Sequence, residues 1–349
     1  MPAVKDAVNG APRGRLPIVG AGYAGLAVAI ELTRKGFEVE VVEVVPELTT
    51  QGLIFDYAKS LGIKFRFGKR VNEYFEETDR ARVVIEGERI EADGVIAADG
   101  IHSAARKHVM GIHQHPRISG FAFTETDEDL FCVWLGADTH AILFILMDLR
   151  SAIIFCTHKD TYEVEESNTP EKLIDWKLLW RGPIRQWVSD TGNITLVGDA
   201  AHPHLPTSGQ GAAQAIEDAA TIAALLDKLR KEAIPAAFRA FEKLRYERTS
   251  LTQRMGWETR HRWHQTDWEA VAANPQFLKM PQPMWLYVHN PEKYAYERCD
   301  EAAESIEEGT SFVSTNVPEG HVHEDWTVET MMELEKQQAR EAFYRVANK

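Results

Sequence analysis

The stretch LPIVGAGYAGLAVAIELTRKGFEVEVVE, residues 16–43, decides the fold class of this 349-residue chain. Its first apolar residues predict a short strand, and the spacing of apolar side chains from Leu26 to Lys35 predicts a helix. Alternating side chains from Phe37 to Glu43 predict a second strand. A strand, helix and strand in this order form a βαβ unit, which predicts a parallel sheet. Pro17 has no N–H group and is expected to weaken the first strand.

The turn between the first strand and the helix has the GxGxxG spacing of a dinucleotide site. Gly20, Gly22 and Gly25 would allow a tight turn, close approach of a phosphate and close packing of helix on strand. The helix N-terminus attracts the phosphate charge. Glu43 ends the second strand, where a carboxylate can accept hydrogen bonds from ribose hydroxyls. A chance glycine turn with a solvated glutamate is the alternative, but the strand–turn–helix context favours a nucleotide.

A second motif, DGIHSAAR, begins at Asp99 and follows the apolar run Gly94–Ala97. Asp99 would therefore lie at the carboxyl end of a strand, which is the usual ligand edge of an α/β sheet. An ordinary Asp-Gly turn explains the same residues equally well.

A third motif, GDAAHPHLPTSGQGAAQAIEDA, spans residues 198–219 and follows an expected strand at Ile194–Val197. It places the carboxylate of Asp199 after the strand, then a loop constrained by proline and glycine, then a helix of small residues. Small residues let backbone N–H groups approach a flat, electron-rich ring, and the helix N-terminus can stabilise negative charge on it. A helix-capping loop is the alternative.

The rest of the chain shows short strands followed by helices. Further strands are expected at Lys64–Phe67, Val83–Ile85, Gly94–Ala98, Phe131–Leu135, Ile142–Leu146 and Ala152–Cys156. The last three are joined by short connections and predict an antiparallel sheet on the substrate side. Helices are expected at about Gly211–Lys231, Pro235–Arg254 and Trp326–Ala347.

Composition excludes several classes of partner. The formal net charge of −14 disfavours nucleic acids and anionic membranes, both of which need a basic surface. The three cysteines, Cys132, Cys156 and Cys299, form no CxxC pair, which is typical of reduced intracellular thiols. The polar residues 1–15 contain no signal-peptide core, and the most apolar run, Ala141–Met147, is too short to span a membrane. We expect a cytoplasmic protein with no membrane span and no metal site.

Taken in order, the three motifs resemble those of the FAD-dependent aromatic-ring hydroxylases, which are single-component flavoprotein monooxygenases. The salicylate-hydroxylase-like enzymes of fungal and bacterial metabolism are the most similar subgroup. The resemblance covers about Leu16 to Arg254, and residues 198–219 are its most specific part. It implies an α/β fold with a Rossmann-like FAD-binding domain of the glutathione-reductase type, a mainly antiparallel substrate layer and a helical C-terminal region. The implied boundaries are a disordered leader at 1–14, the FAD domain at 15–115 and 193–254, the substrate layer at 116–192 and the C-terminal region at 255–349.

The resemblance also implies roles for individual residues. The implied cofactor-binding residues are Gly20, Gly22, Gly25, Glu43, Asp99, Asp199, Gly209, Gln210, Gly211 and Ala212. The three glycines of the first turn would hold the FAD pyrophosphate and Glu43 the adenosine ribose. Asp99 would lie near the pyrophosphate and is tied to the use of NADH or NADPH, Asp199 would bind the ribityl or pyrophosphate portion, and residues 209–212 would face the isoalloxazine ring. His202 is expected to be structural, because the flavin itself carries the chemistry, and no catalytic residue is predicted.

The implied reaction uses NADH or NADPH and O2 to hydroxylate an aromatic or enolic small molecule, in secondary metabolism. Flavin-dependent epoxidation, oxidative decarboxylation, or a truncated flavin-binding paralogue with little activity are the alternatives. A plain NAD(P) dehydrogenase fits poorly, because it does not explain residues 198–219. The sequence leaves a monomer and a homodimer open.

The chain departs from the family pattern after Glu43. The family has a longer connection there, including an arginine that contacts the cofactor, whereas residues 44–52 contain no Lys or Arg. The segment Thr161–Trp176 is also short. These departures predict weak FAD retention and loss of coupling between NAD(P)H oxidation and hydroxylation.

Overall fold

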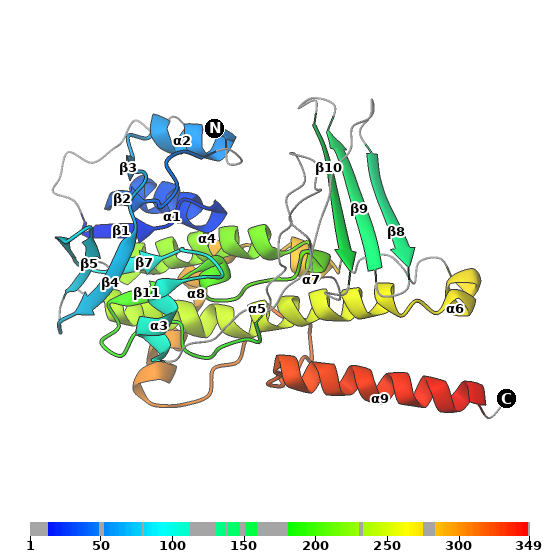
Figure 1. The fold of residues 1–349 in the computed structure, drawn as a ribbon. Helices are drawn as coiled ribbons and strands as arrows, with labels where there is room; N and C mark the ends of the chain where they lie inside the picture. Colours follow the sequence, from blue (N-terminus) through cyan, green and yellow to red (C-terminus); the bar gives the residue numbers. More distant parts are fainter. Residues whose placement is uncertain are drawn as a thin grey trace.

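The computed structural model describes residues 13–48, 52–78, 80–111, 130–136, 139–146, 151–158, 181–229, 233–274 and 283–347. At its centre lies a parallel sheet with the strand order β11-β7-β1-β2-β3 (Figure 1). The strands are β1 (Arg15–Val19), β2 (Glu38–Val42), β3 (Lys64–Arg66), β7 (Val95–Ala97) and β11 (Ile194–Leu196). Strands β7 and β11 are fully buried, and burial of both faces explains their apolar runs, whereas β2 and β3 each keep an exposed residue.

The βαβ unit predicted from residues 16–43 is confirmed. Helix α1 (Tyr23–Arg34) connects β1 to β2, and the two strands pair in parallel from Arg15–Glu38 to Val19–Val42. Pro17 is accommodated within β1, although β7 pairs with β1 only from Ile18 onward. The α/β class therefore holds despite the proline.

Helices and a small meander cover the sheet. Helix α1 packs on β1 and β2, α2 (Gly52–Ser60) packs on α1, and α4 (Gly211–Leu229) lies along α1. The antiparallel strands β4 (Val71–Glu76), β5 (Ala81–Ile85) and β6 (Glu88–Ala92) form the meander, which contacts β1 and β7. The sequence predicted β5 but missed β4 and β6, whose exposed faces carry glutamates that hide the apolar alternation. Helix α3 (Ala104–Met110) packs between β4 and β11.

The predicted antiparallel layer is confirmed. Strands β8 (Leu130–Gly136), β9 (Thr139–Leu146) and β10 (Ser151–His158) form a separate sheet with the order β10-β9-β8. This sheet stands over the second half of the long helix α5 (Ile234–His264) in Figure 1. Strand β9 ends at the expected Leu146, and every other strand end lies one to three residues beyond the expected range.

The C-terminal region is helical, as predicted. Helix α5 continues past the expected end at Arg254, because Trp257 and Trp263 are buried on it, and the expected domain boundary at 254/255 therefore lies inside a helix. The remaining elements are the short helices η2 (Gly198–Ala200) and η3 (Pro206–Ser208), α6 (Trp268–Ala273), α7 (Met284–Tyr287), α8 (Pro291–Glu307) and α9 (Val328–Ala347). The division of the chain into domains stays a prediction.

Four further expectations concern the leader, the cysteines, a membrane span and a metal site. The leader expected at 1–14 lies outside the described residues except for Arg13 and Gly14, and Arg13 forms an ion pair with Asp227. Cys299 is free and buried. Within the described ranges, no helix combines the length and apolar character needed to cross a membrane, and no group of three or more His, Cys, Asp or Glu side chains could hold a metal ion.

Candidate functional site

The first and second sequence motifs meet at the carboxyl edge of the parallel sheet. Gly20 has φ +103°, and a Cβ atom there would lie 2.3 Å from the carbonyl oxygen of Ala98, which directly follows β7. A Cβ atom at Gly25 would lie 1.9 Å from the Gly20 carbonyl oxygen. Both distances are far below any real carbon–oxygen contact. These two glycines therefore bring the strand, the turn and the helix together without a ligand.

Gly22 differs from its two neighbours in the motif. A Cβ atom added to Gly22 would meet no protein atom within 4 Å. Gly22 is also the N-cap of α1, and no side chain caps that helix end. An open space at an uncapped helix N-terminus suits a phosphate group, because free N–H groups and the helix dipole both favour an anion. The residues present therefore fit the pyrophosphate of FAD.

Glu43 lies beside the same turn. Its side chain is buried, and Oε2 accepts a hydrogen bond from the Ala21 N–H at 2.6 Å while Oε1 accepts one from the Val45 N–H at 3.0 Å. Each carboxylate oxygen can accept a further bond. Glu43 thus stabilises the glycine turn and keeps acceptor capacity for a ribose hydroxyl.

Asp99 combines the two roles that the sequence left open. Its Oδ2 accepts hydrogen bonds from the Ala104 N–H at 2.8 Å and from the Tyr74 hydroxyl at 3.4 Å, so it caps α3. Its Oδ1 is buried, and no partner reaches it from the described residues. Burial raises the pKa of this carboxyl, although hydrogen bonds from Ser103 and the α3 amides oppose the shift. Asp99 is therefore a helix cap with one oxygen left to bind a ligand.

The third motif reaches the same edge through its first residues. Gly198 has φ +58°, and a Cβ atom there would lie 2.7 Å from Cβ of Ala24 on α1. Asp199 follows in η2 and remains exposed, while the surrounding protein reduces its hydration and raises the pKa of its carboxyl. The Asp199 carboxylate and the Gly22 turn thus flank one region at the ends of β1 and β11.

Helix α5 fixes the loop of the third motif through hydrogen bonds. The Thr207 hydroxyl donates to the Gly256 carbonyl at 2.7 Å, and Gln253 Nε2 donates to the Pro203 carbonyl at 2.8 Å. A Cβ atom at Gly256 would lie 2.9 Å from Cβ of Ser208, so the helix needs a glycine at this point. The loop delivers Gly209, Gln210, Gly211 and Ala212 to the start of α4. Gln210 is buried and Ala212 is exposed there.

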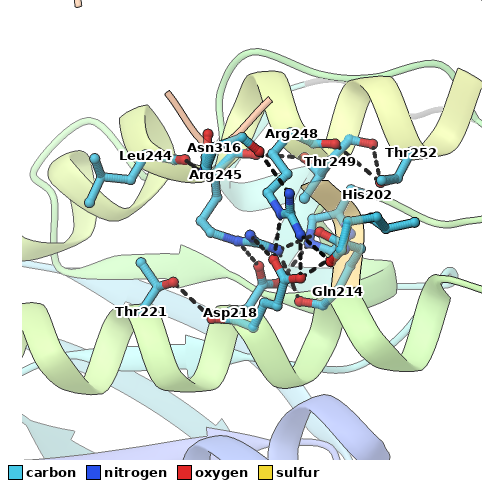
Figure 2. A network of polar contacts seen from close by, with 12 residues as sticks. His202, Gln214, Asp218, Thr221, Leu244, Arg245, Arg248, Thr249, Thr252 and Asn316 are labelled. Carbon is cyan, nitrogen blue, oxygen red and sulfur yellow. Dashed lines mark hydrogen bonds and ion pairs between the residues drawn. The ribbon is translucent and has the colours of Figure 1, made fainter. Parts of the chain in front are cut away.

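A buried polar network fixes the position of this loop (Figure 2). Asp218 on α4 is fully buried and accepts hydrogen bonds from the Gly198 N–H at 2.9 Å, His202 Nε2 at 2.6 Å and Arg245 Nε at 2.9 Å. Burial alone would raise the pKa of Asp218, but the charges of His202 and Arg245 and these hydrogen bonds lower it to about 2. His202 is 1% exposed and packs against the ring of Trp187. This placement fits the structural role expected for His202.

The network continues into the C-terminal region. Glu217 accepts hydrogen bonds from Arg245 Nη1 at 2.5 Å and from Arg248 Nε at 2.7 Å. Arg248 also donates to the carbonyl oxygens of Asn316 at 2.7 Å and Leu286 at 2.9 Å. None of the three sequence motifs includes Arg245 or Arg248. Two arginines three residues apart, facing the Glu-Asp pair of a buried helix, are the signal that could have found them.

Most predicted cofactor residues lie at one edge of the sheet. Gly20, Gly22, Gly25, Glu43, Asp99 and Asp199 surround the ends of β1, β2, β7 and β11. Residues 209–212 lie at the start of α4, which packs along α1. The structure thus brings all three motifs to one place, and the role of each residue toward FAD stays a prediction.

Comparisons with known proteins agree with this arrangement. Residues 3–120 match a model of the pyridine nucleotide-disulphide oxidoreductases, and residues 166–255 match a model described as an FAD binding domain. The chain is 33% identical over 322 residues to asperlicin C monooxygenase of Petromyces alliaceus, with 78% of this chain and 70% of that protein covered. The alignment is longer than the part of this chain that it covers, so the relative has residues that this chain lacks.

Solved structures show the same fold. The crystal structure of CtdE in complex with FAD and a substrate is 26% identical, with a TM-score of 0.75 and coverage of 84% of this chain and 100% of that one. A salicylate hydroxylase substrate complex, at 19% identity, has a TM-score of 0.62 and covers 84% of this chain and 98% of its own. This second likeness concerns the fold alone.

Proposed function

Because the chain belongs to the family of FAD-dependent monooxygenases, we propose that it hydroxylates an aromatic or enolic small molecule of secondary metabolism with NADH or NADPH and O2. The observation that carries the proposal is the meeting of the three motifs at the carboxyl edge of one parallel sheet. When bound, FAD would accept electrons from NAD(P)H and activate O2. The protein would hold the cofactor and orient the substrate ring.

The side chains divide this work between the two ends of FAD. At the adenosine end, Gly22 leaves room for the pyrophosphate at the N-terminus of α1, and Glu43 offers a carboxylate to the ribose. At the flavin end, Asp199 offers an exposed carboxylate to the ribityl hydroxyls. Residues 209–212 lie at the start of α4, where the helix has free backbone N–H groups and the positive end of its dipole. Negative charge on a reduced ring would be stabilised there.

The substrate would lie between this edge and the antiparallel sheet β8–β10. That sheet contacts α5 (Figure 1). The same helix binds the loop of the third motif before α4, called the flavin loop from here on, through Gln253 and Gly256. A single rigid helix thus fixes both sides of the proposed cleft, which favours a defined distance between ring and substrate.

A second candidate, a flavin-binding protein with little coupled activity, is favoured by one observation. The side chains of Val44 and Val45, directly after Glu43, are 45% and 41% exposed, and Leu53 at the start of α2 is 89% exposed. Apolar side chains on both sides of the shortened connection are uncovered where the family has additional residues. An open wall would admit water to the cofactor.

The test is turnover of the purified protein supplied with FAD. We expect slow NADH or NADPH oxidation that an aromatic substrate from a phenol panel accelerates, with one atom of labelled O2 in the minor fraction of turnovers that form product. Gly22→Val serves as the matched inactive control. FAD binding and NAD(P)H oxidation with hydrogen peroxide as the only product would favour the second candidate. Absence of FAD binding would contradict both.

A further inference from the structure

Within the described ranges, Arg106 on α3 is a buried cation without a counter-charge. Its side chain is 2% exposed, and the described residues supply no hydrogen-bond partner to Nε or Nη1. Nη2 makes a long hydrogen bond to the Ala201 carbonyl oxygen at 3.4 Å. Burying a guanidinium without an anion costs several kcal/mol. A natural core rarely keeps such a group unless something compensates it.

A second arginine lies close to the first. Gln253 Nε2 donates to the carbonyls of Pro203 at 2.8 Å and Arg181 at 3.4 Å, which fixes Arg181 beside the loop that Arg106 contacts. The Nε of Arg181 is also buried, and no partner reaches it from the part of the chain that the structure describes. The two positive charges repel each other, and burial together with this repulsion lowers the pKa of Arg106 to about 9. Among the described residues, no carboxylate acts against that shift.

We propose that Arg106 and Arg181 form a binding site for a small oxyanion, behind the loop of residues 198–205. Two guanidinium groups present planar N–H donors, and such donors bind phosphate and carboxylate oxygens in preference to a spherical halide. Phosphate is the better fit of the two, because a dianion neutralises both cations. The site is separate from the proposed FAD site and does not depend on the proposed function.

The site has a defined connection to the flavin loop. Arg106 contacts the Ala201 carbonyl, and Ala201 lies between Asp199 and His202 in the third motif. An anion that binds the guanidinium would therefore stabilise the loop at Ala201, two residues from Asp199. This link makes the ligand a stabiliser of the loop.

The experiment measures thermal unfolding of the protein, dialysed to low salt, during titration with phosphate at constant ionic strength. For wild type we expect a saturable rise in Tm of about 2 °C in the millimolar range, from mass action alone. Acetate should give a smaller saturable rise, and chloride none. Phosphate also stabilises proteins by exclusion from their surface, but that effect grows without saturation.

The matched variant is Arg106→Met, which keeps the length and apolar stem of the side chain. Without phosphate, it should be at least as stable as wild type, because an unpaired buried charge has been removed. With phosphate, the Tm of the variant should rise only through exclusion of phosphate from the surface, which does not saturate. Wild type should then be the more stable of the two proteins. Arg181→Gln should weaken the apparent phosphate affinity about tenfold, as expected for loss of one charge-assisted bond.

Three results would overturn the proposal. Equal destabilisation of Arg106→Met with and without phosphate, including failure to fold in either buffer, would mean that the chain itself neutralises Arg106. A wild-type response to chloride equal to that to phosphate would mean general screening. The same saturable response in wild type and in both variants would place the anion elsewhere.

Discussion

Replacement of Gly22 by valine should separate cofactor binding from folding. The glycine has φ −70° and ψ −175°, an extended conformation that any residue adopts, and an added Cβ atom meets no protein atom within 4 Å. A side chain at this position therefore displaces only a ligand. The free energy of unfolding of the protein without FAD should change by less than about 1 kcal/mol, because loss of glycine flexibility in the unfolded chain offsets a poorer N-cap.

The expected loss of FAD affinity follows from the helix end. No side chain caps α1, so its first N–H groups are left for the pyrophosphate. A valine side chain pushes the phosphate away from at least one of them, and a charge-assisted hydrogen bond is worth about 1.5–3 kcal/mol. The dissociation constant should rise by about 10- to 150-fold. Quenching of flavin fluorescence during titration of the protein with FAD measures it.

Two other glycines provide the contrast. Gly20→Ala places Cβ at 2.3 Å from the Ala98 carbonyl in a left-handed conformation, and it should lower the stability of the protein itself. Gly182→Ala meets no atom closer than 3.4 Å and lies beside Thr327, away from the glycine turn, so it should change neither property. An unchanged FAD affinity of Gly22→Val, with the fold intact, would refute the assignment of this turn to the pyrophosphate.

Four further results are expected. Asp199→Ala should weaken FAD binding about 10- to 150-fold with the fold intact, as measured by titration, and unchanged affinity would mean that Asp199 only shapes its loop. Arg248→Met should lower the free energy of unfolding in urea by about 1.5–3 kcal/mol, because the half-buried Glu217 loses one of its two arginine partners, whereas Arg254→Met, which breaks a more exposed pair with Glu258, should cost less than about 1 kcal/mol. Burial and the charge of His202 lower the pKa of His204 to about 3. The free energy of unfolding should therefore be highest above pH 6.5 and decrease as the pH drops toward 3, by about 2 kcal/mol at pH 5. His204→Gln should flatten the dependence of the free energy of unfolding on pH in this window, and an unchanged dependence would contradict the shift. NAD(P)H oxidation should be slow and yield mainly hydrogen peroxide, and a longer connection after residue 43 should raise both FAD retention and product yield. Stoichiometric hydroxylation by the present chain would show that other residues close the site.

Local chemistry made the centre of the fold predictable. The turn at Gly20 and Gly25 has no alternative packing once a strand precedes it and a helix follows, because any Cβ atom would collide with the backbone. The position of Glu43 follows from the length of β2, and that of Asp99 from the apolar run before it. The Gly20–Gly25 contact and the distance from the turn to Glu43 fall within the roughly thirty residues of one βαβ unit, although the carbonyl that Gly20 approaches belongs to Ala98, far along the chain.

The contacts that the sequence did not reveal are long-range. Arg248 meets Glu217 across 31 positions and the Asn316 carbonyl across 68 positions. Nothing near Arg248 in the sequence distinguishes it from the half-buried Arg254, since both lie on the same charged helix. Glutamates on the open faces of β4 and β6 similarly hid two strands whose inner faces are buried. The hidden features are those in which tertiary packing overrides local composition.

The same long-range contacts link the C-terminal region to the proposed cofactor site. Arg245 divides its hydrogen bonds between Glu217 and Asp218, and it can serve both only while Arg248 neutralises Glu217. Arg248 is in turn held by carbonyl groups from α7 and from the chain before α9. If those carbonyls were removed, Arg245 would be drawn toward Glu217, and Asp218 would lose a cation while it still holds the Gly198 N–H and His202. The geometry of the flavin loop should therefore depend on residues 283–327, which contribute no side chain to the predicted cofactor set.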